Sequence, residues 1–353
     1  MMLTFRYRVK GVSAAKRLNA MAIAVNQIWN YCGGIHNDSR RLNRRWPSGY
    51  DLIKLTNGAS KEIGLHSDTV QAVCKQFAIS RDKAKRRPRW RVSFGTNRSL
   101  GWVPFQCARP IKVNGDIVTF LGNRYRLWLS RAIPEDIRSG SFSQDATGRW
   151  YLNLVCGVPD DLAAGTGEIG IDLGLKDLAT LSTGEKIANP RHIRRSAEKL
   201  AKAQRAGRKA LARKIHRKVA AQRRHHLHQI STRLAKENAL VVVGNVNSAA
   251  LARTKMAKSV LDAGWSAFRS MLRYKIAMRR GAVFVEANER YSTQTCSCCG
   301  SRAGSPKGLK GLGVRQWVCE GCGVLHDRDQ NAAFNILLSG RSIALQATEI
   351  PAL

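Results

Sequence analysis

The stretch EIGIDLGLKDLATLSTGEKI, residues 168–187, decides the fold of the second half of this chain. Its apolar residues fall into two short runs with glycine and polar residues between them, which predicts two strands joined by a tight turn. Further along, ALVVVGNV (239–246) and AVFVEA (282–287) have the β-branched composition of buried strands. The segments between these strands have apolar residues at helical spacing, which predicts helices there. We therefore expect a mixed α/β sheet that begins with a hairpin and continues through helical connections, as in RNase H-type folds.

The composition changes near residues 160–167, where small and acidic residues form a predicted linker. Before this linker, alternating residues at 3–9 and from 92 onward predict strands, and helical spacing predicts a helical insertion at about 12–90. We expect a β-rich module at 1–160 that carries this insertion. We expect residues 161–353 to form the RNase H-like domain, with basic helices at 191–238 and a cysteine-rich insertion at about 292–325.

Nine cysteines are present, and four of them form two Cys-x2-Cys pairs, Cys296/Cys299 and Cys319/Cys322, with nineteen residues between the pairs. Two such knuckles supply four thiolates for a tetrahedral Zn²⁺. Four protein ligands leave no open position, so we expect a structural zinc ribbon. Cys298 lies inside the first knuckle and could compete as a ligand, but its spacing to Cys296 is too short.

Two aspartates lie where a carboxylate needs a partner. Asp172 is inside a predicted buried strand, where an unpaired carboxylate is costly unless a cation neutralises it. Asp329 lies in HDRDQNAA (326–333), just before the last predicted helix, where its other interpretation is a helix N-cap. A strand aspartate and an aspartate opening a late helix are what a two-metal phosphodiester site needs, with Mg²⁺ ions about 4 Å apart.

The charge of the chain predicts a nucleic-acid partner. Lys and Arg total 60 against 24 Asp and Glu, a net charge of +36. Residues 191–236 hold sixteen Lys and Arg and a single acid, Glu198, at a spacing that predicts cationic helix faces for phosphate. A second basic run, 83–91, has a tryptophan within it for base stacking. The predicted nucleic-acid contacts are Arg86, Arg87, Arg89, Trp90, Arg208, Lys209, Arg213, Lys214, Arg217, Lys218, Arg223 and Arg224.

No apolar run approaches the length of a membrane span, and the start MMLTFRYRVKG lacks the apolar segment of a secretory signal. We therefore expect a cytoplasmic protein that associates with the nucleoid through its nucleic-acid partners. The chain has no coiled-coil heptad run, so the sequence predicts no oligomeric state.

Three segments resemble motifs of the TnpB proteins, which are transposon-encoded RNA-guided nucleases also called OrfB transposases. GIDLGLKDLATLSTGEKI (170–187), YSTQTCSCCG with WVCEGCG (291–300, 317–323) and HDRDQNAAFNIL (326–337) are similar to the RuvC-I, zinc-finger and RuvC-III motifs of that family. The resemblance covers about 165–340. It implies a RuvC-like domain in which Asp172 and Asp329 bind Mg²⁺, with Asp327 as the alternative to Asp329.

The same resemblance implies the rest of the family's architecture and activity. The first module would be a wedge-like β-barrel with a helical recognition region. The activity would be RNA-guided DNA cleavage, with a guide RNA and a double-stranded target DNA that carries a short flanking motif as partners.

One motif departs from the family. The RuvC-II strand usually ends in a glutamate, but here that position is Gly244, followed by Asn245. Some branches resemble this chain and take the missing carboxylate from the next strand. Adjacent strands lie about 4.8 Å apart, so a glutamate at the neighbouring strand end reaches the same metal pair. Glu289 fits that position best, and Glu286, within the strand, is the weaker candidate.

Three other functions stay open at this point. A nuclease-inactive, RNA-guided DNA-binding repressor would explain Gly244 and Asn245, but it leaves the presence of both Asp172 and Asp329 unexplained. A transposase that joins DNA ends ranks lower, because the sequence shows no tyrosine nucleophile in a histidine-rich site. A transposase accessory protein also ranks below the nuclease.

Overall fold

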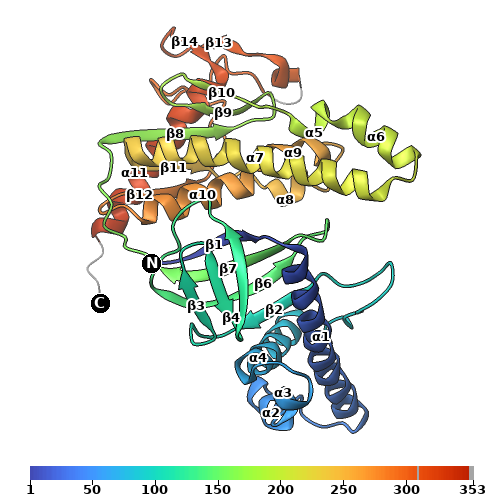
Figure 1. Ribbon diagram of the computed structural model, residues 1–353. Helices are drawn as coiled ribbons and strands as arrows, with labels where there is room; N and C mark the ends of the chain where they lie inside the picture. Colours follow the sequence, from blue (N-terminus) through green and yellow to red (C-terminus); the bar gives the residue numbers. More distant parts are fainter. Residues whose placement is uncertain (308–309, 350–353) are drawn as a thin grey trace. The chain divides into compact units, whose positions relative to one another are not determined.

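The computed structural model describes residues 1–307 and 310–349 (Figure 1). Residues 308–309, within the predicted cysteine-rich insertion, and 350–353, at the end of the predicted second domain, lie outside the described residues. The chain forms two compact units, Met1–Val158 and Pro159–Leu353. None of the described helices is both long and apolar enough to span a bilayer.

The first unit is built on a seven-stranded sheet in the order β2-β6-β7-β1-β5-β4-β3, with every neighbouring pair antiparallel. Over the described residues the pairings run from β2 to β3 and do not join these two edge strands. The expected β-module is therefore present as an antiparallel sheet, and no closed barrel is assigned. Its strands are β1 (Met2–Val9), β2 (Trp102–Phe105), β3 (Ile111–Asn114), β4 (Ile117–Phe120), β5 (Asn123–Trp128), β6 (Ile137–Gln144) and β7 (Trp150–Gly157).

Helices between β1 and β2 complete this unit (Figure 1). Leu18 and Phe77, from the first and last of them, join Tyr7 and Trp150 of the sheet in one buried cluster. Burying such side chains contributes about 1.5–3 kcal/mol each, which gives the unit a core of its own. The helices are α1 (Val12–Arg41), α2 (Gly49–Leu55), α3 (Ala59–Glu62) and α4 (Ser67–Ala84).

The second unit has the predicted mixed sheet, in the order β10-β9-β8-β11-β12. The first three strands form an antiparallel meander, and β11 and β12 add in parallel. Parallel neighbours require crossover connections, and helices supply them here. The strands are β8 (Gly167–Leu173), β9 (Asp177–Leu181), β10 (Lys186–Ala188), β11 (Asn238–Gly244) and β12 (Val283–Ala287).

Helices cover both faces of this sheet. Alternate residues such as Ile171 and Val243 pack with Leu227 of α7 (Lys209–Glu237) and Phe268 of α10 (Trp265–Ala277). The opposite alternation, including Val242, packs with residues of α11 (Arg328–Glu349). Because side chains alternate along a strand, Asp172 and Gly244 both belong to the α11 face.

Shorter elements complete the unit. A two-stranded hairpin of β13 (Gln316–Val318) and β14 (Leu325–Asp327) leads directly into α11. The remaining elements are α5 (His192–Arg195), α6 (Ala197–Arg205), α8 (Ser248–Leu251), α9 (Ala257–Ala263) and the 3-10 turn η1 (Lys310–Gly313).

Candidate metal centres and nucleic-acid interface

Asp172 lies near the end of the central strand β8, opposite Thr180 of β9. Burial raises the pKa of Asp172 to about 8, and the negative charges of Glu289 and Asp329 act in the same direction, opposed by Arg328. A carboxyl group in this position is neutral at pH 7 unless a cation binds beside it. Asp172 therefore has the electrostatic environment of a metal ligand that exchanges its proton for a cation.

Glu289 follows the end of β12 by two residues and fills the space beside Gly244. A Cβ atom built on Gly244 would lie 2.7 Å from Oε2 of Glu289 and 3.2 Å from Cδ1 of Ile336. Glycine at residue 244 is thus the feature that admits this carboxylate. Burial raises the pKa of Glu289, while the nearby Arg269 guanidinium lowers it. The structure brings Glu289 close enough to Asp172 for its charge to raise the pKa of Asp172.

Glu286 has a different environment. It is exposed and pairs with Arg273, whose Nη2 donates to its Oε1 at 2.6 Å. The carboxylate is already neutralised by an arginine on α10, and it lies on the face of β12 opposite to that of Val285 and Ala287.

Asp329 is not the cap of α11. The carboxylate of Asp327 caps that helix, because its Oδ1 accepts from the backbone N–H of Asp329 at 3.0 Å and of Gln330 at 3.1 Å. Asp327 also pairs with Lys186 at 2.7 Å. Asp329 is left to project from the first turn of the helix, where Nη1 of Arg315 donates to both of its oxygens at 3.2 and 3.1 Å.

The three acids are linked by their charges, since Glu289 and Asp329 both raise the pKa of Asp172. Two Mg²⁺ ions about 4 Å apart, each about 2.1 Å from its oxygens, permit ligands up to about 8 Å apart. Hard carboxylate oxygens are also the donors that Mg²⁺ prefers, so the residues fit this group.

A hollow of about 720 Å³ adjoins Glu289. Its lining includes amides, hydroxyls, the cations Arg269 and Arg290, and the carboxylates of Glu286 and Glu289. Arg269 is held in place because its Nη1 donates to the carbonyl oxygen of Val246 at 3.2 Å. The hollow therefore places charges of both signs beside Gly244.

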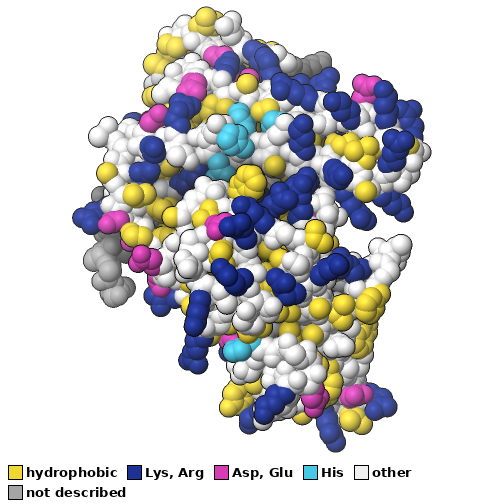
Figure 2. All heavy atoms as spheres, viewed as in Figure 1, with side chains coloured by type: hydrophobic (Ala, Val, Ile, Leu, Met, Phe, Trp, Pro, Cys, Tyr) yellow, Lys and Arg dark blue, Asp and Glu magenta, His cyan; other side chains and the backbone are white. Residues whose placement is uncertain are grey.

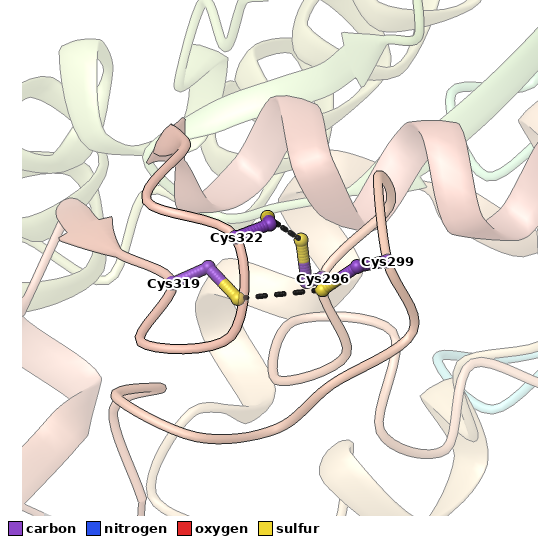
Figure 3. A group of neighbouring side chains, drawn as sticks. All are labelled: Cys296, Cys299, Cys319 and Cys322. Atoms are coloured by element: carbon purple, nitrogen blue, oxygen red, sulfur yellow. Dashed lines mark hydrogen bonds between the residues drawn. The ribbon is translucent and has the colours of Figure 1, made fainter.

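The four predicted zinc ligands meet in one cluster (Figure 3). The Sγ atoms of Cys296 and Cys322 are 3.6 Å apart, as are those of Cys299 and Cys319. A tetrahedral ion with Zn–S bonds of about 2.3 Å needs sulfur atoms about 3.8 Å apart, so the cluster fits zinc. Cys298 is exposed and stands outside it.

Residues that the sequence did not single out tie this ribbon to α11. Nε2 of His326 lies 3.0 Å from Sγ of Cys296, and His326 is buried against Trp317. On α11, Asn331 donates to the carbonyl oxygens of Ser292 and Thr295, at 3.2 and 2.8 Å. The signal that could have revealed the asparagine is its polar side chain on the buried face of a helix. These bonds fix the ribbon on the helix that carries Asp329.

Lys and Arg side chains, dark blue in Figure 2, cover much of the surface around α6 and α7. The predicted cations at 208–224 divide into a half-buried group and an exposed group. Arg217 and Arg223 are half-buried, and Nη1 of Arg223 donates to the carbonyl oxygen of Leu261 at 2.9 Å, so Arg223 braces the fold. The exposed cations are Arg208, Lys209, Arg213, Lys214, Lys218 and Arg224.

The second basic run is partly structural as well. Arg87 is half-buried, with its guanidinium 4.9 Å from the centre of the Trp90 ring, and that ring packs beside Gly33 of α1. Arg86 and Arg89 are exposed, as is Trp90. The nucleic-acid contacts predicted here therefore include two free cations and one braced one.

Comparisons with known proteins agree with this architecture. Residues 154–255 match the family described as "Probable transposase", OrfB of the IS605 type, and residues 265–336 match the family described as "Cas12f1-like, TNB domain". A Streptomyces pristinaespiralis protein named "Putative RNA-guided DNA endonuclease" is 40% identical over 229 residues, which are 60% of this chain and 55% of that protein. The mimivirus TnpB-like protein L79 is 30% identical over 144 residues, 36% of this chain and 25% of that protein.

One solved structure, a Cas12f1–sgRNA–target DNA complex, aligns over 96% of this chain and 99% of that chain, at 14% identity and a TM-score of 0.34. That score is too low to carry an argument. The chain is thus similar to OrfB-type transposon proteins at residues 154–255. It is similar to TnpB-like proteins and to a protein named as an RNA-guided DNA endonuclease over part of its length. It spans about half the length of the Streptomyces relative that it matches.

Proposed function

We propose that this protein is an RNA-guided DNA endonuclease that hydrolyses phosphodiester bonds at the Asp172, Glu289 and Asp329 site. The observation that supports this most strongly is the complementarity of Gly244 and Glu289. The family's usual glutamate is missing from β11, and another carboxylate from beyond β12 occupies the space that a side chain there would fill. A decayed site has no reason to keep that fit.

In this proposal the three carboxylates hold two Mg²⁺ ions from different sides. Bound Mg²⁺ lowers the pKa of a coordinated water and offsets the charge that develops on the phosphate. Asp172 of the central strand, Glu289 beyond the end of β12 and Asp329 on α11 would be the residues that hold the ions. Arg315, which donates to both oxygens of Asp329, would have to release that carboxylate.

The partners we propose are a guide RNA and a double-stranded target DNA with a short flanking motif. The exposed cations of α7 and of the 83–91 run supply phosphate contacts to the guide–target duplex, whose backbone rather than sequence the protein would bind. The zinc ribbon stabilises the segment that leads into α11. A protein with these partners would act in the cytoplasm, at the nucleoid.

The test is plasmid cleavage with a co-expressed guide RNA, in Mg²⁺ or in EDTA. Asp172→Ala and Glu289→Ala are each expected to reduce guide-dependent cutting by at least about 10²-fold. Glu286→Ala is the matched control on the same strand, and it should cut like the wild type because its carboxylate pairs with Arg273. Cutting that survives Glu289→Ala but not Glu286→Ala would refute the assignment.

The second candidate function is a guided DNA-binding repressor without cleavage, which Gly244 and Asn245 suggested. Guide-dependent retention of target DNA with no cutting in Mg²⁺ would select it over the nuclease.

A further inference from the structure

The loop of residues 91–100 is an ordered projection from the first unit, between α4 and β2. Its first residue is fixed to α1 by three hydrogen bonds. The backbone N–H of Arg91 donates to Oδ1 of Asn30 at 2.8 Å, and Nδ2 of Asn30 donates to the carbonyl oxygen of Arg91 at 2.9 Å. Nε of Arg91 donates to Oδ1 of Asn26 at 2.6 Å. These three hydrogen bonds anchor the base of the loop to α1.

The two arms of the loop are closed on each other. The N–H of Ser99 donates to the carbonyl oxygen of Val92 at 2.8 Å, and Oγ of Ser99 accepts from the N–H of Val92 at 3.0 Å. Nδ2 of Asn26 donates to Oγ of Ser93 at 3.1 Å. The turn itself needs the positive φ of +78° at Gly95, which glycine adopts without strain.

Phe94 occupies the tip of this braced loop and is 71% exposed, more than any other aromatic side chain among the described residues. Nothing in the loop's hydrogen bonding requires an aromatic there. An exposed phenyl ring forgoes the stabilisation that burial would give, which favours a contact made outside the fold.

The surroundings of Phe94 indicate the chemistry of that contact. Residues 83–115 contain nine Lys and Arg and no Asp or Glu. Arg86, Arg89 and Trp90 are exposed on the approach to the loop, and the residues that follow Phe94 at the tip are small and polar. An exposed aromatic ring among cations is typical of surfaces that stack bases while neutralising phosphates. The absence of acids from residues 83–115 favours a polyanionic partner over a protein partner.

We propose that Phe94 is a stacking platform for an unpaired nucleobase of a nucleic-acid strand whose phosphates contact Arg86 and Arg89. The loop is preorganised by its hydrogen bonds, so little conformational entropy is lost when a base stacks on the ring. The base belongs to an RNA or a DNA strand, since the face of every base can stack.

The experiment measures binding of the full-length chain to three oligonucleotides that carry 2-aminopurine: single-stranded RNA, single-stranded DNA and a blunt DNA duplex. Phe94→Ala is expected to weaken binding to at least one single strand by roughly 5- to 150-fold and to abolish the fluorescence change of its 2-aminopurine. Phe94→Trp should restore both. The single strand affected identifies whether the base comes from RNA or DNA.

Tyr50→Ala is the matched control, because Tyr50 is 66% exposed and lies near Lys54 but is on α2. It should bind all three probes like the wild type. Equal binding by Phe94→Ala and the wild type to both single strands would overturn the proposal. So would an equal loss on the blunt duplex, which offers no unpaired base. The measurement can be repeated with Asp172→Ala, so its outcome does not depend on nuclease activity.

Discussion

Gly244→Ala tests whether the carboxylate of Glu289 acts where the structure places it. The new Cβ would lie 2.7 Å from Oε2 of Glu289, and ordinary contact begins at 3.4 Å, so the carboxylate must retreat by about 0.7 Å. Metal-ligand distances tolerate only about 0.2 Å, and misplacement by about 1 Å can cost about 10²-fold in rate. We therefore expect Gly244→Ala to cut target DNA between about ten- and a hundred-fold more slowly.

The same variant should remain stable. The two nearest atoms, from Glu289 and Ile336, are the free ends of flexible side chains that can move aside. Alanine is also favoured over glycine inside a strand by about 0.5–1 kcal/mol, which offsets the crowding. The free energy of unfolding, from urea titration without Mg²⁺, should stay within about 1 kcal/mol of wild type while single-turnover cleavage falls.

Moving the glutamate from residue 289 to residue 244 should restore part of the cleavage rate. Glu289→Ala alone is expected to be inactive, and adding Gly244→Glu should restore at least about ten-fold of the lost rate, because the carboxylate then enters the same space from β11. Two mutations that each disable the site but together restore it show coupling that independent sites do not. Wild-type cutting by Gly244→Ala, or a double variant no more active than Glu289→Ala, would refute the reasoning.

Three further predictions concern the ribbon, a buried lysine and α7. Cys319→Ser should lose the bound zinc measured by mass spectrometry, whereas Cys298→Ser should keep it, since only Cys319 belongs to the cluster. Burial lowers the pKa of Lys275 to about 8, below its unfolded value of about 10.4. Stability should therefore rise from pH 8 to 10 in the wild type relative to Lys275→Met, as urea midpoints at pH 7 and 9.5 would show; equal midpoint differences would contradict this. Lys214→Ala should lower the salt dependence of RNA binding by about one phosphate contact, and an unchanged slope in a filter-binding series would count against that contact.

Local chemistry made much of this fold predictable. The cysteine pairs carry their ligand geometry in their spacing, and the four sulfur atoms meet as expected. The hairpin of β8 and β9 and the parallel strands β11 and β12 followed from runs whose composition suits burial. These signals depend on neighbours in sequence, or on repeated patterns, and need no knowledge of the packed chain.

The roles of side chains that depend on packing were harder to predict from the sequence. Asp327 and Asp329 are two residues apart in one motif, and only the backbone at the start of α11 shows which carboxylate caps the helix. Arg223 and Arg224 are adjacent cations on one helix, yet Arg223 is turned toward the carbonyl oxygen of Leu261. Charge alone could not distinguish an arginine that bonds within the fold from one that contacts nucleic acid, because a cationic helix contains both.

Gly244 shows how a substitution that suggests decay can instead report a rearranged site. By itself, a glycine in place of a glutamate removes a metal ligand. In the structure the same glycine leaves the volume that Oε2 of Glu289 occupies, so the two positions exclude each other sterically. A chain with a side chain at 244 would have to place residue 289 elsewhere, and a chain with glycine there has room for the carboxylate. The missing glutamate at the end of β11 and the glutamate beyond the end of β12 are therefore one structural feature. Exchanging the residues at 244 and 289 together tests it.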